Sequence, residues 1–166
     1  MKPLASKLFA TVVIALATHN NWARAQSLPQ LSAAAVCPAV KAITAPQLYG
    51  MWQVSFTDPP AGLPSTAVML LERHQEFGDS VAGTVSRERV SAVGHAGKAA
   101  LAGDVEDGFV ILDESSDNQS ISGTWNGELV GASCGREIRG SWKDTSAGAP
   151  PDAPDIAFVM VKRAGR

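Results

Sequence analysis

Apolar and polar side chains alternate with a period of two in much of the chain beyond residue 48. Trp52, Val54 and Phe56 fall on one side of the first such segment, and the residues between them fall on the other. This alternation is typical of a β-strand with one buried face. Seven further segments have strand composition, so the predicted strands are 49–56, 66–73, 81–86, 98–105, 109–113, 121–129, 137–143 and 156–163.

Turn-forming residues separate these segments. Phe77-Gly78-Asp79 and Asp107-Gly108 predict tight hairpin turns, and a loop rich in Pro and Gly occupies 146–154. No helical pattern lies between the strands, which disfavours a parallel sheet with crossover helices. The prediction is an all-β fold, an eight-stranded antiparallel up-and-down barrel whose closure removes exposed strand edges. An interior of this size holds either side chains or one small ligand.

The start of the chain has the pattern of an exported protein. Lys2 and Lys7 give a positive region before an apolar run over 8–17, and Ala23-Arg24-Ala25 forms an A-x-A cleavage site. The run is too short to cross a bilayer, and the alternative of a buried N-terminal helix would need an amphipathic stripe. We therefore expect a signal peptide at 1–25, a tethered N-terminal leader at 26–45 and a single β-barrel domain at 46–166. The expected location is the periplasm or the outside of the cell.

Length and charge exclude several classes of protein. With 166 residues, 45% of them hydrophobic and 18% charged, the chain fits one compact domain. The net charge is −2, and removal of residues 1–25 takes away three basic and no acidic residues, which leaves −5. An acidic chain of this kind does not predict nucleic-acid binding. No second apolar stretch approaches about 20 residues, so membrane insertion is not expected.

Two cysteines, Cys37 and Cys134, remain after export. In an oxidising compartment a single pair predicts a disulfide. The alternative, a catalytic or metal-binding thiol, needs a nearby base or further ligands, and neither cysteine has a histidine close in the sequence. The disulfide would tie the leader to the segment after the sixth predicted strand.

Three tryptophans are candidates for ligand binding. Trp52, Trp125 and Trp142 each lie on the inward face of a predicted strand. Aromatic side chains are common walls of small-molecule pockets, so the three would line a hydrophobic site. The alternative is that they fill the floor of a small closed barrel, where inward glycines make room for them.

Two arginines extend the candidate site. Arg87 and Arg89 continue the apolar face of the third predicted strand, so they would point inward near a mouth of the barrel. There they could neutralise an anionic ligand. The alternative is a pair of solvated arginines at the rim, paired with Glu72 or Glu88.

No recognisable catalytic or metal-binding motif is present. His74 and His95, the histidines of the exported chain, have no partner at metal-ligand spacing. The acidic residues within 104–117, Glu114 among them, lack a D-x-D-x-D-G calcium loop and are typical of hairpin turns. There is no Gly-x-Ser-x-Gly elbow and no triad motif. The protein is therefore expected not to be an enzyme, and to use no metal and no cofactor.

The motif Gly-x-Trp occurs on three predicted strands, as Gly50-Met51-Trp52, Gly123-Thr124-Trp125 and Gly140-Ser141-Trp142. The first resembles the Gly-x-Trp of the first strand in calycin-type barrels, the group that holds lipocalins, avidins and bacterial metalloprotease inhibitors. In lipocalins a basic residue near the end of the barrel packs on this Trp, and Arg163 is similarly placed here. The segment from Thr124 to Trp142 also resembles the tryptophan-bearing strands of avidins, although it does not carry their biotin-binding pattern.

These features favour binding over catalysis. The expected function is that of a secreted or periplasmic barrel that takes a small hydrophobic or amphipathic ligand. An alternative rests on Ala45-Pro46-Gln47-Leu48 before the first Gly-x-Trp, which resembles the opening of the metalloprotease inhibitors, whose N-terminal segment enters the enzyme cleft. That resemblance implies a proteinase-inhibitor-like module with a secreted protease as partner. Cys37 departs from the pattern, because a disulfide there would tie the leader down. The sequence predicts no oligomeric state.

Overall fold

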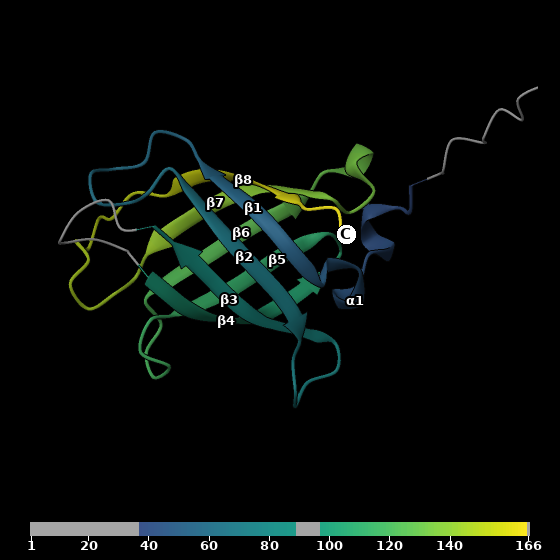
Figure 1. Cartoon of the computed structure of the whole chain (residues 1–166), viewed down its shortest axis with the longest axis horizontal. Coiled ribbons are helices and arrows are strands. Elements are labelled where there is room, and N and C mark those ends of the chain that lie inside the picture. The colour runs from purple at the N-terminus through teal and green to yellow at the C-terminus, as the bar shows by residue number, and fades with distance from the viewer. Residues whose placement is uncertain (1–36, 89–96, 166) are drawn as a thin grey trace, which may run out of the picture. The chain divides into compact units, whose positions relative to one another are not determined.

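The computed structural model describes residues 37–88 and 97–165, which form a closed barrel of eight antiparallel strands (Figure 1). The strands follow one another around the barrel in sequence order, and the first pairs with the last to close it. Their bounds are β1 Gly50–Phe56, β2 Thr66–Arg73, β3 Ser80–Arg87, β4 Gly97–Glu106, β5 Phe109–Ser115, β6 Gly123–Leu129, β7 Glu137–Asp144 and β8 Ile156–Lys162. The predicted all-β class and up-and-down order are confirmed.

Apolar side chains from every strand fill the interior of the barrel. Trp52, Val54 and Phe56 on β1 are all buried, as the alternation predicts. The ring of Trp125 lies 5.6 Å from that of Phe56 and 5.1 Å from that of Phe158, measured between centroids. At these distances the rings are in contact, so side chains occupy the centre of the barrel.

An inward glycine makes room for one of the large rings. A Cβ atom at Gly123 on β6 would lie 2.6 Å from Nε1 of Trp142 on the neighbouring β7. Any larger residue at this position would force the indole to move.

A short helix that the alternation does not predict covers one end of the barrel. This helix, α1 (Ala45–Leu48), has a capping box in which the Thr44 backbone N–H donates to Gln47 Oε1 at 2.7 Å. Ala45 and Leu48 are buried, and the Leu48 carbonyl accepts a hydrogen bond of 2.8 Å from Trp52 Nε1. The helix therefore seals the end of the barrel at which β1 begins (Figure 1). Within the described residues, no helix is long and apolar enough to cross a membrane.

The predicted disulfide between Cys37 and Cys134 is present, with the two Cα atoms 4.6 Å apart. Cys134 follows the 3-10 helix η2 (Gly131–Ser133) in the connection between β6 and β7, and Cys37 precedes the 3-10 helix η1 (Val40–Ala42). The bridge therefore ties the chain before α1 to the β6–β7 connection. The predicted signal peptide and the predicted leader up to residue 36 lie outside the described residues.

The basic residue beside Trp52 is Lys162, and not Arg163 as the resemblance to lipocalins implied. Lys162 Nζ lies 5.8 Å from the centroid of the Trp52 ring and donates to the Gln47 carbonyl at 2.6 Å. The reason is strand alternation, since Lys162 has the inward parity of β8 whereas Arg163 follows the strand and donates to the side chain of Gln53. Partial burial lowers the pKa of Lys162.

Candidate functional site at the loop end of the barrel

The end of the barrel opposite α1, called here the loop end, contains a buried ion pair. The connections β1–β2, β5–β6 and β7–β8 lie at this end, as do the last residue of β3 and the first of β4. Arg87 closes β3, and its Nη1 and Nη2 donate to the two carboxylate oxygens of Glu114 on β5 at 2.6 and 2.7 Å. The two side chains are only 3% and 4% exposed. They form a bidentate pair in which each buried charge is compensated by the other.

Two tryptophans complete this arrangement. Trp125 Nε1 and Trp142 Nε1 both donate to Glu114 Oε2, at 3.0 and 3.1 Å. The Arg87 guanidinium lies 5.4 and 5.2 Å from the centroids of the same two rings, within the range of cation–π attraction. We call Arg87, Glu114, Trp125 and Trp142 the buried polar cluster. Both indole N–H groups have an acceptor, which removes most of the penalty for burying them.

Strand alternation places the two charges inside the barrel. Arg87 follows Val85 on the inward face of β3, and Glu114 follows Leu112 on the inward face of β5. The strand between them, β4, contributes the small side chain of Ala99 to this region of the interior. Two long side chains can therefore meet across β4.

Of the two interpretations of Arg87 from the sequence, the inward one is confirmed, and neither included its partner Glu114. The alternative of a solvated arginine paired with Glu72 or Glu88 is wrong for Arg87, which is buried against Glu114. The sequence pattern places Glu114 among acidic residues typical of hairpin turns, and so does not indicate its place in the barrel interior. The inward direction of Glu114 could have been predicted from its position two residues after the apolar Leu112 on the same strand.

The other predicted site residues lie elsewhere. Trp52 lies at the α1 end of the barrel, so the structure separates it from Trp125 and Trp142. Arg89 lies outside the described residues. The structure thus brings Arg87, Trp125 and Trp142 together, and their contact with a ligand stays a prediction.

A cleft lies between the β1–β2 and β7–β8 connections at the loop end. Its volume is about 290 Å³, and it shares Trp142 with the buried polar cluster. We call it the mouth cleft. Its lining consists of Pro60, Ala61, Leu63, Trp142, Asp144, Pro150, Ala153, Pro154 and Ile156.

The mouth cleft is mostly apolar, and hydrogen bonds shape the connections that form it. Leu63, Ala153 and Ile156 are buried and form its deeper part. The Leu63 N–H donates to the Pro60 carbonyl at 3.1 Å, and the Ala153 N–H donates to the Pro150 carbonyl at 3.0 Å. Each connection therefore folds back on itself as a turn, and its prolines fix the backbone dihedral φ. Walls of this kind are largely formed before a ligand arrives.

The mouth cleft has one carboxylate among its described lining residues. Its carboxylate, Asp144, accepts a backbone hydrogen bond within its own connection, and neither histidine nor cysteine is among the described lining residues. Across the described part of the chain, no group of three or more His, Cys, Asp or Glu side chains is placed to hold a metal ion. His74 Nδ1 accepts hydrogen bonds from the backbone N–H groups of Glu76 and Phe77, which places it in the β2–β3 turn. His95 lies outside the described residues.

A scan against models of known protein families and a search of curated proteins find no match to this chain. The closed eight-stranded barrel is compatible with the calycin-type fold that the Gly-x-Trp motifs resemble. Membership of a calycin family stays a prediction from those motifs.

Proposed function

We propose that this protein is an exported, non-enzymatic β-barrel that binds a small apolar or amphipathic ligand in the mouth cleft. The observation that carries the proposal is the mostly apolar lining of this cleft, to which the almost fully buried Trp142 contributes, at the end of a barrel whose interior is filled by side chains. Small-molecule sites are concave, mostly apolar and largely preformed, and the mouth cleft has these properties. The ligand would therefore bind at the mouth of the barrel and not within it.

The volume of the cleft limits the size of the ligand. About 290 Å³ lies near the lower end of the usual range for ligand pockets, which begins at about 300 Å³. It is also roughly twice the ~150 Å³ of an engineered cavity that binds benzene. The proposed ligand thus has the size of about two or three small rings or a short aliphatic chain. An amphipathic ligand would keep its polar group toward solvent.

The buried polar cluster fixes the orientation of the Trp142 ring, which would contact the ligand. The polar atom of its ring, Nε1, donates to Glu114 Oε2 inside the barrel, so Trp142 would contribute only apolar ring atoms to a contact with a ligand. The Arg87 guanidinium lies 5.2 Å from the centroid of the Trp142 ring and further restricts the orientation of that ring. A fixed aromatic wall lowers the entropy lost when a ligand binds.

Titration with the neutral fluorescent probe N-phenyl-1-naphthylamine tests the proposal. We expect saturable binding of this apolar probe, which joins a naphthyl and a phenyl group, to the folded, oxidised protein. The Ala153→Leu substitution should weaken binding at least about tenfold, because the larger side chain would occupy part of the cleft. Ala147→Leu, in the same connection but outside the cleft lining, is the matched control and should change the Kd by less than about twofold.

Circular dichroism and urea unfolding of both variants check that the barrel is intact. The proposal is wrong if the unmodified protein gives no saturable signal, or if Ala153→Leu protein binds the probe as tightly as the unmodified protein. Native mass spectrometry of protein purified from its own host then shows whether a compound of the expected size co-purifies.

The proteinase-inhibitor-like alternative stays a prediction from the segment before the first Gly-x-Trp. The Cys37–Cys134 bridge anchors the chain at the end of the barrel opposite the mouth cleft. Assay of secreted metalloproteases with an excess of this protein separates the two functions. Unchanged protease activity would remove the alternative and leave the cleft proposal standing.

A further inference from the structure

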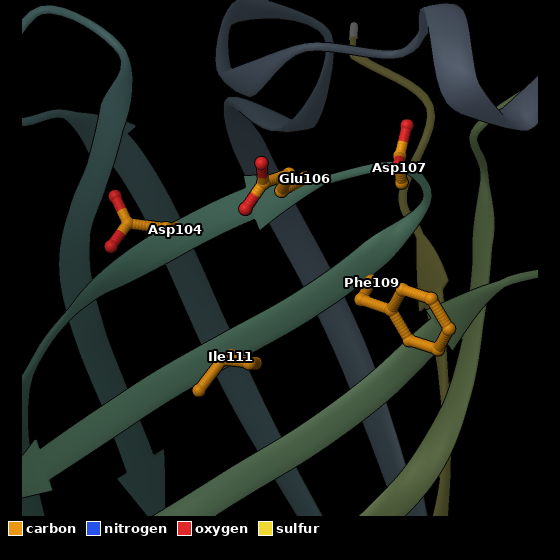
Figure 2. Close-up of a pocket in the computed structure, with 5 residues that line it drawn as sticks. All are labelled: Asp104, Glu106, Asp107, Phe109 and Ile111. Carbon is orange, nitrogen blue, oxygen red and sulfur yellow. The ribbon is translucent and has the colours of Figure 1, made fainter.

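Two large apolar side chains lie in solvent on the outer face of β5. Phe109 and Ile111 are 54% and 55% exposed, whereas Val110 and Leu112, which alternate with them, are buried in the barrel. Figure 2 shows Phe109 and Ile111 on one strand beside Asp104 and Glu106 on the next. A pair of exposed apolar side chains with a polar rim is typical of a protein-interaction surface.

These two residues separate two surface hollows. The first, of about 420 Å³, lies toward β4 and the β4–β5 turn, and is lined by Asp104, Glu106, Asp107, Phe109 and Ile111 (Figure 2). The second, of about 380 Å³, lies toward β6 and β7, and is lined by Phe109, Ile111, Asn126, Gly127, Glu128, Arg139, Gly140 and Ser141. Phe109 and Ile111 thus form a ridge between the hollows. We call the ridge and the two hollows the β5 face.

Carboxylates flank the ridge on both sides. On β4, Glu106 pairs with Phe109 and Asp104 pairs with Ile111 in the sheet register. On β6, Glu128 pairs with Phe109. All three of these acidic residues are exposed. The ridge is therefore an apolar strip with two carboxylates beside it on β4 and one on β6, where Ile111 pairs with the neutral Asn126.

The basic residue at the border of the β5 face does not cancel this charge. Arg139 pairs with Glu128 in the sheet register, and its Nε donates to the side chain of Glu137 on its own strand at 2.7 Å, so one basic group lies beside two carboxylates. Asp107, in the β4–β5 turn, adds a further carboxylate to the first hollow. The β5 face is thus apolar at its centre and negative around it.

We propose that the β5 face docks a segment of another protein that carries an aromatic or aliphatic side chain between lysines or arginines. The apolar side chain would pack on the ridge, and the basic groups would meet the carboxylates in the hollows. Complementary charge of this kind selects partners and speeds their association. A second copy of this chain does not fit, because two β5 faces would bring like charges together. An anionic membrane surface is repelled for the same reason.

The partner would bind through side chains and not by adding a strand. Each strand of the closed barrel is already hydrogen-bonded on both sides, so the barrel offers no free edge for β-augmentation. The β5 face shares no lining residue with the mouth cleft. The two proposals are therefore independent, and each can fail without the other.

Selection of peptides against the oxidised, exported protein tests this proposal. Random linear peptides displayed on phage are selected on the protein, and the enriched ones are synthesised with a fluorescent label. We expect enriched sequences that combine lysine or arginine with aromatic or aliphatic residues. Fluorescence anisotropy should give Kd values that rise with added salt, because exposed charges are screened.

Surface variants locate the binding. The double variant Phe109→Ser/Ile111→Ser and the double variant Asp104→Lys/Glu106→Lys should each raise the Kd at least about tenfold. The controls are Ile121→Ser, which removes a similarly exposed apolar side chain elsewhere, and Glu72→Lys on β2, and both should stay within about twofold of the unmodified protein. Circular dichroism checks the fold, and binding of N-phenyl-1-naphthylamine should be unchanged in all four variants.

Several results would overturn the proposal: no enrichment of peptides, enriched peptides without basic residues, or a Kd that neither double variant changes. Sedimentation showing a dimer that the Phe109→Ser/Ile111→Ser substitution dissociates would assign the β5 face to a second copy of this chain instead.

Discussion

Replacement of Glu114 by glutamine should destabilise the barrel more than most single substitutions. The carboxylate accepts two hydrogen bonds from Arg87 and one from each of two indoles, and all of these groups are buried. Glutamine keeps the size of the side chain but removes the charge. Its amide NH₂ also cannot accept, so it would face either the guanidinium or the indole N–H groups as a second donor.

The magnitude follows from the burial of the pair. Removal of one partner from a buried ion pair leaves the other charge uncompensated, at a cost of about 3–5 kcal/mol. A domain of this size is stable by about 5–15 kcal/mol, so Glu114→Gln should remove a large fraction of the free energy of unfolding. The expected fall in the melting temperature is roughly 10 to 20 °C.

Urea unfolding of the oxidised protein, followed by tryptophan fluorescence, measures this loss. Asp113→Asn is the matched control, because Asp113 is the adjacent residue of β5 but exposed on the outer face, and its effect should stay within about 0.5 kcal/mol. Arg87→Met should also be costly. The double variant Arg87→Met/Glu114→Gln should lose less stability than the two single losses added together, by at least about 2 kcal/mol. A loss below about 1 kcal/mol for Glu114→Gln, or additive effects in the cycle, would refute the reasoning.

Three further predictions concern other parts of the fold. Cys134→Ser opens a bridge between residues 97 apart, and should lower the free energy of unfolding by about 4–5 kcal/mol while circular dichroism still shows the barrel; freely alkylated thiols in the exported protein would contradict it. Gly123→Ala should cost about 1–3 kcal/mol in urea unfolding, because its Cβ would lie 2.6 Å from Trp142 Nε1, whereas Gly148→Ala, with open space around it, should be nearly neutral. Hydrogen bonds from Ser120 and then Gln119 lower the pKa of Asp117, so its contribution to stability is present above about pH 4 and is lost as the pH falls. Below that pH the melting temperature should fall more steeply for the unmodified protein than for Asp117→Asn, and parallel curves would contradict this.

Most of the fold could be predicted from the sequence, because its main signals are local. The inward face of β1 alternates with polar residues, and turn dipeptides such as Asp107-Gly108 separate the hairpins. Antiparallel strands joined by short turns pair with their sequence neighbours, so their order follows from the order in the chain. The helix α1 was not predicted, because a segment of four residues is too short to show a helical period. Its signal is the capping box of Thr44 and Gln47, with Pro46 in the first turn.

The candidate site could be predicted only in part, because its decisive contact is not local. The sequence indicates that Trp125, Trp142 and Arg87 face inward, since each obeys the alternation of its own strand. The meeting of Arg87 with Glu114 depends on β4 lying between their strands and on the register of two ladders. Neither the position of β4 nor the register can be predicted from the spacing of residues along one strand. The mouth cleft depends in the same way on how two connections, far apart in the sequence, fold over the same end of the barrel.

The buried charges also bear on where the protein can bind a ligand. An apolar filling of the same volume is often as stable as a buried ion pair, so stability alone does not account for Arg87 and Glu114. The pair also fixes the orientation of two indole rings, because the carboxylate accepts hydrogen bonds from both indole N–H groups and the guanidinium lies against both rings. Trp142 therefore keeps one orientation where it lines the mouth cleft, and a rigid wall reduces the ordering that binding requires. We infer that the buried polar cluster and the mouth cleft act as the inner and outer parts of one structural unit. A change of probe affinity in the Arg87→Met/Glu114→Gln variant while the barrel stays folded would show this coupling, and unchanged affinity would exclude it.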